Sequence, residues 1–200
     1  MGIADMIGEM KVVTVSGAHK GVGKTALTEL LLQRLPGFAA IKITINDLYT
    51  SVSDEEKEIM VDGKDTFRMK KSGAHKVVWV KTTEHALPGA MEEALSLIGN
   101  SRGLLIEGNS ILNYITPTIA FFVIDTTNVP MKPSRINALK KADLCIINQK
   151  HGAPVKEEAL ENIRSLNPKL KYFSLDLASP LASKSEDVHA LEHYLKEMLS

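Results

Sequence analysis

The chain has 200 residues, 44% of them hydrophobic, and its 24 basic residues balance its 24 acidic residues. This content suffices for one α/β domain over residues 1–200, and the balanced charge argues against nucleic acid or an anionic membrane as the main partner. A single cysteine cannot form a disulfide within the chain, and we find neither a secretory signal nor a membrane-spanning apolar run, so we expect a cytoplasmic protein.

Short apolar runs alternate with segments of helical period along the whole chain. The runs predict strands at 11–16, 39–44, 76–82, 103–107, 119–125, 143–148 and 171–175. The segments between them predict helices at 24–35, 64–73, 88–98, 132–141, 155–165 and 185–199. Because the strands are continuously apolar, both of their faces are expected to be buried. The pattern therefore predicts a three-layer α/β/α fold with a mostly parallel central sheet.

The first predicted strand leads directly into a glycine-rich loop and a helix. Residues 16–25 read SGAHKGVGKT, in which glycines 17, 21 and 23 are expected to take positive φ values and turn N–H groups inward. The helix N-terminus adds partial positive charge, Lys24 can reach the β- and γ-phosphates, and the Thr25 hydroxyl can ligate Mg²⁺. The sequence therefore predicts a nucleotide site on the fold of the P-loop NTPases, although Ala18 stands where the strict pattern has glycine. The predicted nucleotide contacts are Gly17, Ala18, His19, Lys20, Gly21, Val22, Gly23, Lys24, Thr25 and Ala26.

The segment 45–66 is polar and has no firm period. It can be read as a solvated loop, or as a mobile switch or substrate loop beside the phosphates, because loops at the carboxyl ends of parallel strands carry the functional site. Both interpretations stay open.

A nucleotide with Mg²⁺ needs a carboxylate beyond the phosphate loop. Asp47 follows the second predicted strand and Glu107 ends the fourth, where a buried acid is costly unless it binds something. We predict Thr25, Asp47 and Glu107 as the metal-binding residues, and Lys24 and Glu107 as the catalytic pair, with Glu107 orienting water. Asp125 also ends a strand, but a turn or helix cap explains it at least as well.

The stretch 142–151 contains another predicted strand, and many P-loop GTPases read guanine with Asn-Lys-x-Asp at the end of such a strand. Asn148 is present, whereas Gln149 and His151 replace the lysine and the aspartate. We therefore predict Asn148 as a residue of the base-binding loop and leave GTP and ATP open as the cofactor. Cys145 is interpreted as a buried strand residue, and the pair His189 and His193 as a solvated helix face.

Four stretches in order carry a family resemblance. They are the phosphate loop with its helix, AIKITIND at 40–47, GKDTFRMKKSGA at 63–74, and LIEG at 105–108. In these the chain resembles MobB, the family of molybdopterin-guanine dinucleotide biosynthesis adaptor proteins. The resemblance implies GTP binding, weak hydrolysis, a homodimer, and a partner enzyme that attaches GMP to molybdopterin.

The chain also departs from that family. Ile43 and Ile45 stand where members usually have histidine, and Asn109-Ser110 replace the usual Phe-Lys after Glu-Gly. A divergent member with another client is therefore a realistic reading.

Three alternatives belong to other functional classes. A metallochaperone-type GTPase would normally show a Cys-x-Cys site or a His-rich tail, and this chain has neither. A small-molecule kinase could use Arg68, Lys70 and Lys71 as a basic lid over the transferred phosphate. A non-enzymatic interaction module would retain the loop without turnover.

Overall fold

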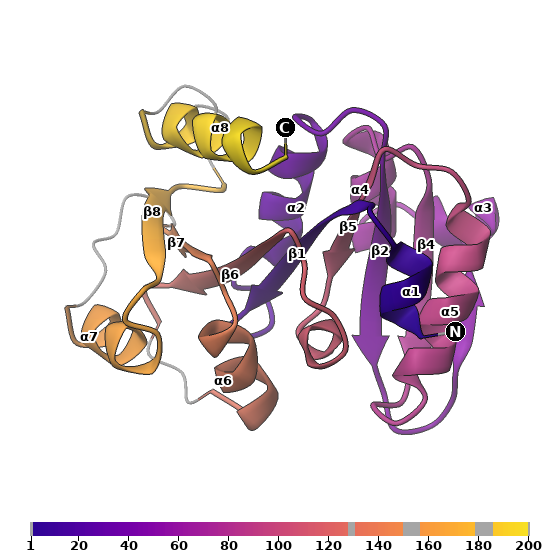
Figure 1. Ribbon diagram of the computed structural model, residues 1–200, viewed down its shortest axis with the longest axis horizontal. Helices are drawn as coiled ribbons and strands as arrows, with labels where there is room; N and C mark the ends of the chain where they lie inside the picture. The colour runs from indigo at the N-terminus through magenta and orange to yellow at the C-terminus, as the bar shows by residue number, and fades with distance from the viewer. Residues whose placement is uncertain (1, 128–130, 150–156, 179–185, 200) are drawn as a thin grey trace.

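A twisted, mostly parallel sheet runs through the middle of the computed structural model, which describes residues 2–127, 131–149, 157–178 and 186–199 (Figure 1). Its strands are β1 (Lys11–Gly17), β2 (Phe38–Ile45), β3 (Ser51–Ser53), β4 (Val77–Thr82), β5 (Gly103–Glu107), β6 (Ile119–Asp125), β7 (Leu144–Asn148) and β8 (Lys171–Leu175). The order across the 8-stranded sheet is β3-β4-β2-β5-β1-β6-β7-β8. Only β3 is antiparallel, and it pairs with β4 at one edge.

Helices cover both faces of this sheet. They are α1 (Ile3–Ile7), α2 (Lys24–Leu32), α3 (Glu56–Ile59), α4 (Asp65–Lys71), α5 (Leu87–Ile98), the 3₁₀ helix η1 (Ser110–Asn113), α6 (Pro133–Lys140), α7 (Glu157–Leu166) and α8 (Glu186–Leu199). Buried side chains of α1, α5, α6 and α7 pack on one face, and those of α2, α3, α4 and α8 pack on the other. The arrangement confirms the predicted three-layer α/β/α fold.

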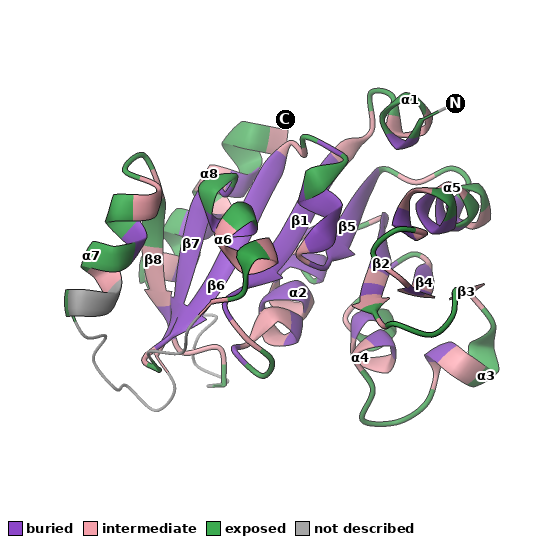
Figure 2. Cartoon of the chain, turned by 90° about the horizontal axis from the view of Figure 1, so that it is seen from below, coloured by how far each residue is buried: buried purple, intermediate pink, exposed green. Residues whose placement is uncertain are grey.

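The inner strands β5, β6 and β7 are buried on both faces, as their continuous apolar sequences predict, whereas the edge strand β8 is exposed at Lys171 and Tyr172 (Figure 2). In β6, Phe122 faces one core cluster while its neighbour Phe121 faces the other, and neither side chain is exposed. Successive side chains point to opposite faces of a strand, so a strand between two helical layers must be apolar at every position.

Four short elements were not predicted: α1, β3, α3 and η1. Two of them, β3 and α3, lie inside the polar segment 45–66, which is therefore partly ordered rather than a continuous loop. Elements of three to five residues are too short to establish a period in the sequence. The starts predicted for the last two helices, at 155 and 185, lie outside the described residues.

The parallel strands bring their carboxyl ends to one edge of the sheet, the edge at which this architecture binds ligands. In that register Glu107 of β5 stands opposite Val15 of β1 on one side and Lys42 of β2 on the other. Of the helices that the structure describes, none has the length and apolar content to span a membrane.

Candidate functional site

The loop between β1 and α2 depends on its glycines in two different ways. Gly23 caps α2 in the left-handed region with φ at 113°, and a Cβ there would lie 2.5 Å from Asn148 Nδ2. Gly21 also has a positive φ, of 80°. Gly17 does not, which corrects the expectation for that residue. A Cβ on Gly17 would instead come within 2.7 Å of Val22 Cγ1, so close packing requires the glycine.

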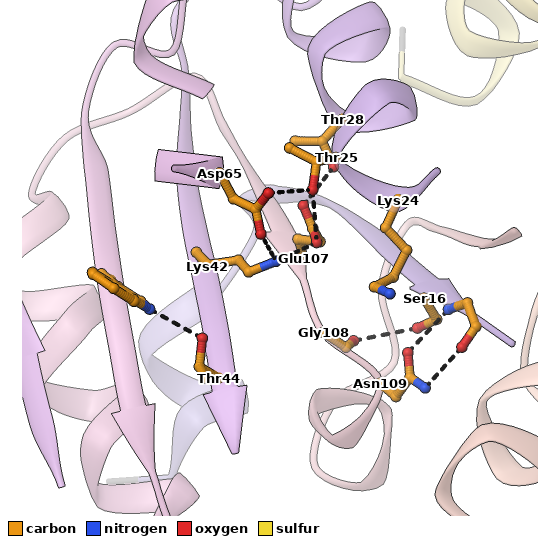
Figure 3. A network of polar contacts seen from close by, with 12 residues as sticks. Ser16, Lys24, Thr25, Thr28, Lys42, Thr44, Asp65, Glu107, Gly108 and Asn109 are labelled. Atoms are coloured by element: carbon orange, nitrogen blue, oxygen red, sulfur yellow. Dashed lines mark hydrogen bonds and ion pairs between the residues drawn. The ribbon is translucent and has the colours of Figure 1, made fainter. Parts of the chain in front are cut away.

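Asn109 anchors the start of this loop (Figure 3). The Gly17 amide donates to Asn109 Oδ1 at 3.0 Å, and Asn109 Nδ2 donates to the Gly17 carbonyl at 3.1 Å. The Ser16 hydroxyl also donates to the Gly108 carbonyl at 3.3 Å. The residues after Glu107 therefore position the first turn of the loop, and Asn109 is a functional residue that sequence reasoning missed.

Asn148 holds the loop from the other side. Its buried side chain donates from Nδ2 to the Val22 carbonyl at 2.9 Å and accepts the Leu177 amide at Oδ1, at 3.1 Å. These bonds place Asn148 behind the phosphate loop, where it fixes the backbone around Gly23. A contact with the nucleotide base stays a prediction, and of the two altered positions, Gln149 and His151, the second lies outside the described residues.

His19 turns away from the cleft toward the end of β6. Its Nδ1 lies 2.8 Å from the Lys20 carbonyl oxygen, and its Nε2 lies 2.9 Å from Asp125 Oδ1. The Thr127 hydroxyl donates to the same carboxylate and lies 2.9 Å from His19 Nε2. Asp125 thus ends its strand in a hydrogen-bonded turn that ties down the loop.

These contacts give Asp125 a pH-dependent role in stability. Burial would raise the pKa of its carboxyl, but hydrogen bonds from Thr127 and His19 outweigh burial and lower the pKa below its usual range. A lowered carboxyl pKa adds stability above the ordinary value of about 4, and that stability is lost as the pH falls through the folded-state pKa.

We expect Asp125→Asn to cost about 1.5–3 kcal/mol at pH 7 through lost charge-assisted hydrogen bonds. Urea unfolding at pH 6 and pH 3 should also show a smaller acid-induced loss of stability in the variant than in the unchanged chain. Asp47→Asn, at an exposed position, serves as the control and should leave the loss unchanged. Equal losses in the unchanged chain and in Asp125→Asn would contradict the assignment.

Lys24 lies at the start of α2 and reaches back along the loop. Its Nζ donates to the His19 carbonyl at 3.2 Å. Burial lowers the pKa of Lys24, against the opposing field of Glu107. A half-buried lysine that, within the described residues, donates to its own loop at 3.2 Å is available to an incoming phosphate.

Next to Lys24, two carboxylates and a lysine form a charged network (Figure 3). Lys42 Nζ lies 2.5 Å from Glu107 Oε1 and 2.6 Å from Asp65 Oδ2. The Thr25 hydroxyl lies 2.9 Å from Asp65 Oδ1 and 3.4 Å from Glu107 Oε1. The Thr28 hydroxyl lies 3.4 Å from Glu107 Oε2. Glu107 is only 1% exposed, so Lys42 compensates a charge that water scarcely reaches.

Within this network the pKa values of Lys42 and Asp65 shift in opposite directions. Burial alone would lower the pKa of Lys42 and raise that of Asp65. For Lys42 the charge of Glu107, followed by the bond to Asp65, outweighs burial and raises the pKa, and for Asp65 the contact with Lys42 outweighs burial and lowers the pKa. Lys42 and Asp65 are therefore both charged at neutral pH.

Asp47, predicted as a metal ligand, stands apart from this network. Asn46 Oδ1 accepts the amides of Leu48 and Tyr49, and this turn leaves Asp47 exposed after β2. Asp65, to which no role was assigned, is the acid that contacts Thr25. Asp47 as a ligand stays a prediction that the geometry of the network does not support.

The network lines one end of a cleft of about 490 Å³. Four cationic side chains and two carboxylates face it, which favours a polyanion. Six of the predicted nucleotide contacts line it: Lys20, Gly21, Gly23, Lys24, Thr25 and Ala26. The other four predicted contacts belong to the loop but do not line the cleft: Gly17, Ala18, His19 and Val22.

Of the predicted basic lid, only Arg68 faces the cleft. A bidentate ion pair holds its guanidinium against Glu29, at 2.9 and 2.5 Å. Lys70 instead donates to the carbonyls of Ala74 and His75. Lys71 lies 5.6 Å from the centre of the Phe67 ring.

The structure offers no soft-metal site within its described ranges. Cys145 is buried in β7, where burial raises the pKa of its thiol to about 12, so it stays protonated and packs as an apolar residue as predicted. Across those ranges no group of three His, Cys, Asp or Glu side chains is placed to hold a metal ion. His189 and His193 are exposed on α8, as predicted.

No protein-family model matches this chain, and no curated protein sequence matches it. Solved structures do match it in fold. The hydrogenase maturation factor HypB from Archaeoglobus fulgidus superposes with a TM-score of 0.57 at 16% identity, over 99% of this chain and 95% of that one. HypB from Helicobacter pylori in complex with nickel gives 0.61 at 16% identity, over 95% and 87%.

LpxK from Aquifex aeolicus in complex with ATP matches with a TM-score of 0.51 at 14% identity, over 74% of this chain and 51% of that chain. At these identities the matches show the fold alone. That fold is the one of the P-loop NTPases, to which all three structures belong.

Proposed function

We propose that this chain binds a purine nucleoside triphosphate, with GTP preferred, and acts as an adaptor with weak Mg²⁺-dependent hydrolysis in the manner of MobB proteins. The observation that carries the proposal is the phosphate loop itself. Its backbone is fixed from both sides by Asn109 and Asn148, and its Lys24 lies at the cleft and donates to the His19 carbonyl of the loop. A rigid, cationic cradle of this kind binds a polyphosphate without first having to be ordered.

The donor atoms beside Lys24 fit Mg²⁺. The Thr25 hydroxyl and the carboxylates of Asp65 and Glu107 converge within hydrogen-bond distance, and Mg²⁺ prefers such hard oxygen ligands. Mg²⁺ usually takes one or two protein oxygens and fills its other positions with phosphates and water. Thr25 and Glu107 would hold the ion or its waters, with Asp65 in support, and the bound ion would neutralise charge on the phosphates.

The protein side chains have separate parts in the reaction. Lys24 and the loop N–H groups would hold the β- and γ-phosphates, where negative charge develops during transfer. Glu107 would orient the attacking water, because its carboxylate is fixed by Lys42 and Thr28 at the end of β5. Lys42 is committed to two carboxylates, so it compensates charge rather than contacting phosphate.

The adaptor role rests on the family resemblance of residues 1–110. From that resemblance we infer a homodimer whose client attaches GMP to molybdopterin, and from the sequence we infer a single domain in the cytoplasm. At Ile43 and Asn109 the chain departs from the family pattern, and both residues are at the site: Ile43 lines the cleft and Asn109 is hydrogen-bonded to the loop. The identity of the client depends on these two positions. Purified protein added to a molybdopterin guanylylation reaction should raise its rate, and an unchanged rate would exclude this client.

Titration by thermal shift tests nucleotide binding. GTP, ATP and their diphosphates are added with and without Mg²⁺. A ligand that binds only the folded state adds about 2.7 kcal/mol of stability at a hundredfold excess over its Kd. We expect GTP with Mg²⁺ to raise Tm most. Equal shifts with ATP would contradict the preference for guanine, and no shift with any nucleotide would overturn the proposed function.

A further inference from the structure

A second cavity, of about 250 Å³, adjoins the phosphate cleft. Lys42, Thr44 and Asp65 line both cavities, so the two are neighbours with a shared wall. The far side of the smaller cavity is formed by Lys64, just before α4, and Trp79 of β4. Nothing in the nucleotide-binding scheme uses these two residues.

The indole of Trp79 is held in a fixed orientation. Its Nε1 donates to the Thr44 hydroxyl at 3.0 Å, on the neighbouring strand β2. Lysines approach the ring at two places, with Lys64 Nζ 4.8 Å and Lys81 Nζ 4.3 Å from its centre. The ring therefore presents a positioned apolar surface in a cationic setting.

The two lysines beside the ring differ in their partners. Lys81 forms an ion pair with Glu58 at 3.0 Å and does not line the cavity. For Lys64, no carboxylate in the described ranges lies within ion-pair distance, and the ring of Trp79 is its contact. Lys42 is already neutralised by Asp65 and Glu107. Of the two lysines that line this cavity, Lys64 is therefore the one that can bind an anionic ligand.

We propose that this cavity is a second ligand site, which takes a small organic phosphate or carboxylate. Lys64 binds the anionic group, and the apolar part of the molecule packs on Trp79. The volume suits a molecule of a few rings at most, smaller than a nucleotide. A ligand here would lie beside the network that faces the terminal phosphate, which makes it a candidate substrate or effector of the nucleotide reaction.

Binding at this site stands independently of the nucleotide, whereas coupling between the two sites rests on the proposed function. Because Lys42 and Asp65 line both cavities, a ligand that moves either side chain changes the affinity of the other site. Such coupling is reciprocal, so each ligand must alter the Kd of the other by the same factor.

The chain has one tryptophan, so its fluorescence reports on this cavity without labelling. Phenyl phosphate and benzoate serve as probes that carry an aromatic ring with a phosphate or a carboxylate. Inorganic phosphate carries the anionic group without the ring. The titrations use the Lys24→Met variant, in which phosphate binding at the loop is weakened, and are repeated in the unchanged chain saturated with GDP. Phenyl phosphate or benzoate should change Trp79 emission saturably, whichever anionic group is preferred, and inorganic phosphate should bind at least tenfold more weakly.

Lys64→Ala should weaken binding of the preferred aromatic probe at least tenfold, and Lys81→Ala should leave it within twofold. Lys64 makes no side-chain cap to α4, so its removal does not threaten the helix. Equal Kd values in the unchanged chain and Lys64→Ala, or no saturable change with either aromatic probe, would overturn the second site. If the unchanged chain bound none of the nucleotides but still gave a saturable response to an aromatic probe, the proposed function would be overturned and the second site would stand.

Discussion

Lys24→Met should abolish the nucleotide-dependent rise in Tm while leaving the nucleotide-free protein at least as stable as the unchanged chain. The first effect follows from charge-assisted hydrogen bonds to phosphate, which are worth about 1.5–3 kcal/mol each. We therefore expect nucleotide affinity to fall about 100-fold, since each factor of ten corresponds to about 1.4 kcal/mol. Calorimetric titration with GTP and Mg²⁺ measures this loss of affinity.

The second effect follows from the lowered pKa of Lys24. Burial makes the charged form less favourable in the folded protein than in the unfolded chain, so at neutral pH this charge opposes folding. Methionine keeps most of the volume and removes the charge. Lys57→Met, at an exposed lysine that does not line the cleft, is the control and should change neither property. If Lys24→Met bound nucleotide as tightly as the control, Lys24 would not be a phosphate ligand.

Lys42→Met should destabilise the folded protein by about 3–5 kcal/mol, because it leaves Glu107 buried without its cation. For a domain of this size that loss corresponds to a fall in Tm of roughly 6–20 °C, at about 2–4 °C per kcal/mol. Urea unfolding at pH 7 gives the free energy. Lys42→Met/Glu107→Gln should recover a large part of the loss, since it removes both charges together.

The lysine pKa sets the pH range of this effect. A raised lysine pKa adds stability that is fully present below the ordinary value of about 10.4 and is lost only as the pH rises through the folded-state pKa. The difference between Lys42→Met and the unchanged chain should therefore be constant from pH 6 to pH 9. Lys81→Met is the matched control, because its partner Glu58 is 34% exposed, and it should cost less than about 1 kcal/mol. Equal losses in the two variants would show that Glu107 does not depend on Lys42.

Asp47 and Asp65 show which spatial contact the sequence could not locate. Asp47 is close to the end of β2 in sequence, but the turn made by Asn46 and the antiparallel strand β3 carry the chain away from the cleft. Asp65 lies 18 positions later, and α4 returns it to Thr25. No pattern within 45–66 signals this return, because β3 and α3 are too short to leave a period.

The second site depends even more on packing. Lys64 and Trp79 belong to different elements, and neither has a motif of its own. The register between β2 and β4 brings Thr44 close enough to orient the indole, and the cavity exists only where α4 and these strands meet.

The sequence by itself determined the layered α/β fold, the phosphate loop with Lys24 and Thr25, and the strand-end position of Glu107. These features follow from local periodicity and from the residues that a tight turn and a helix start require, so neighbouring positions in the sequence suffice to predict them. Only the tertiary structure decided that Lys42 neutralises Glu107, that Asp65 rather than Asp47 meets Thr25, and that Asn109 and Asn148 fix the loop. Each of these contacts joins segments far apart in the chain, and the order and register of the parallel strands bring them together.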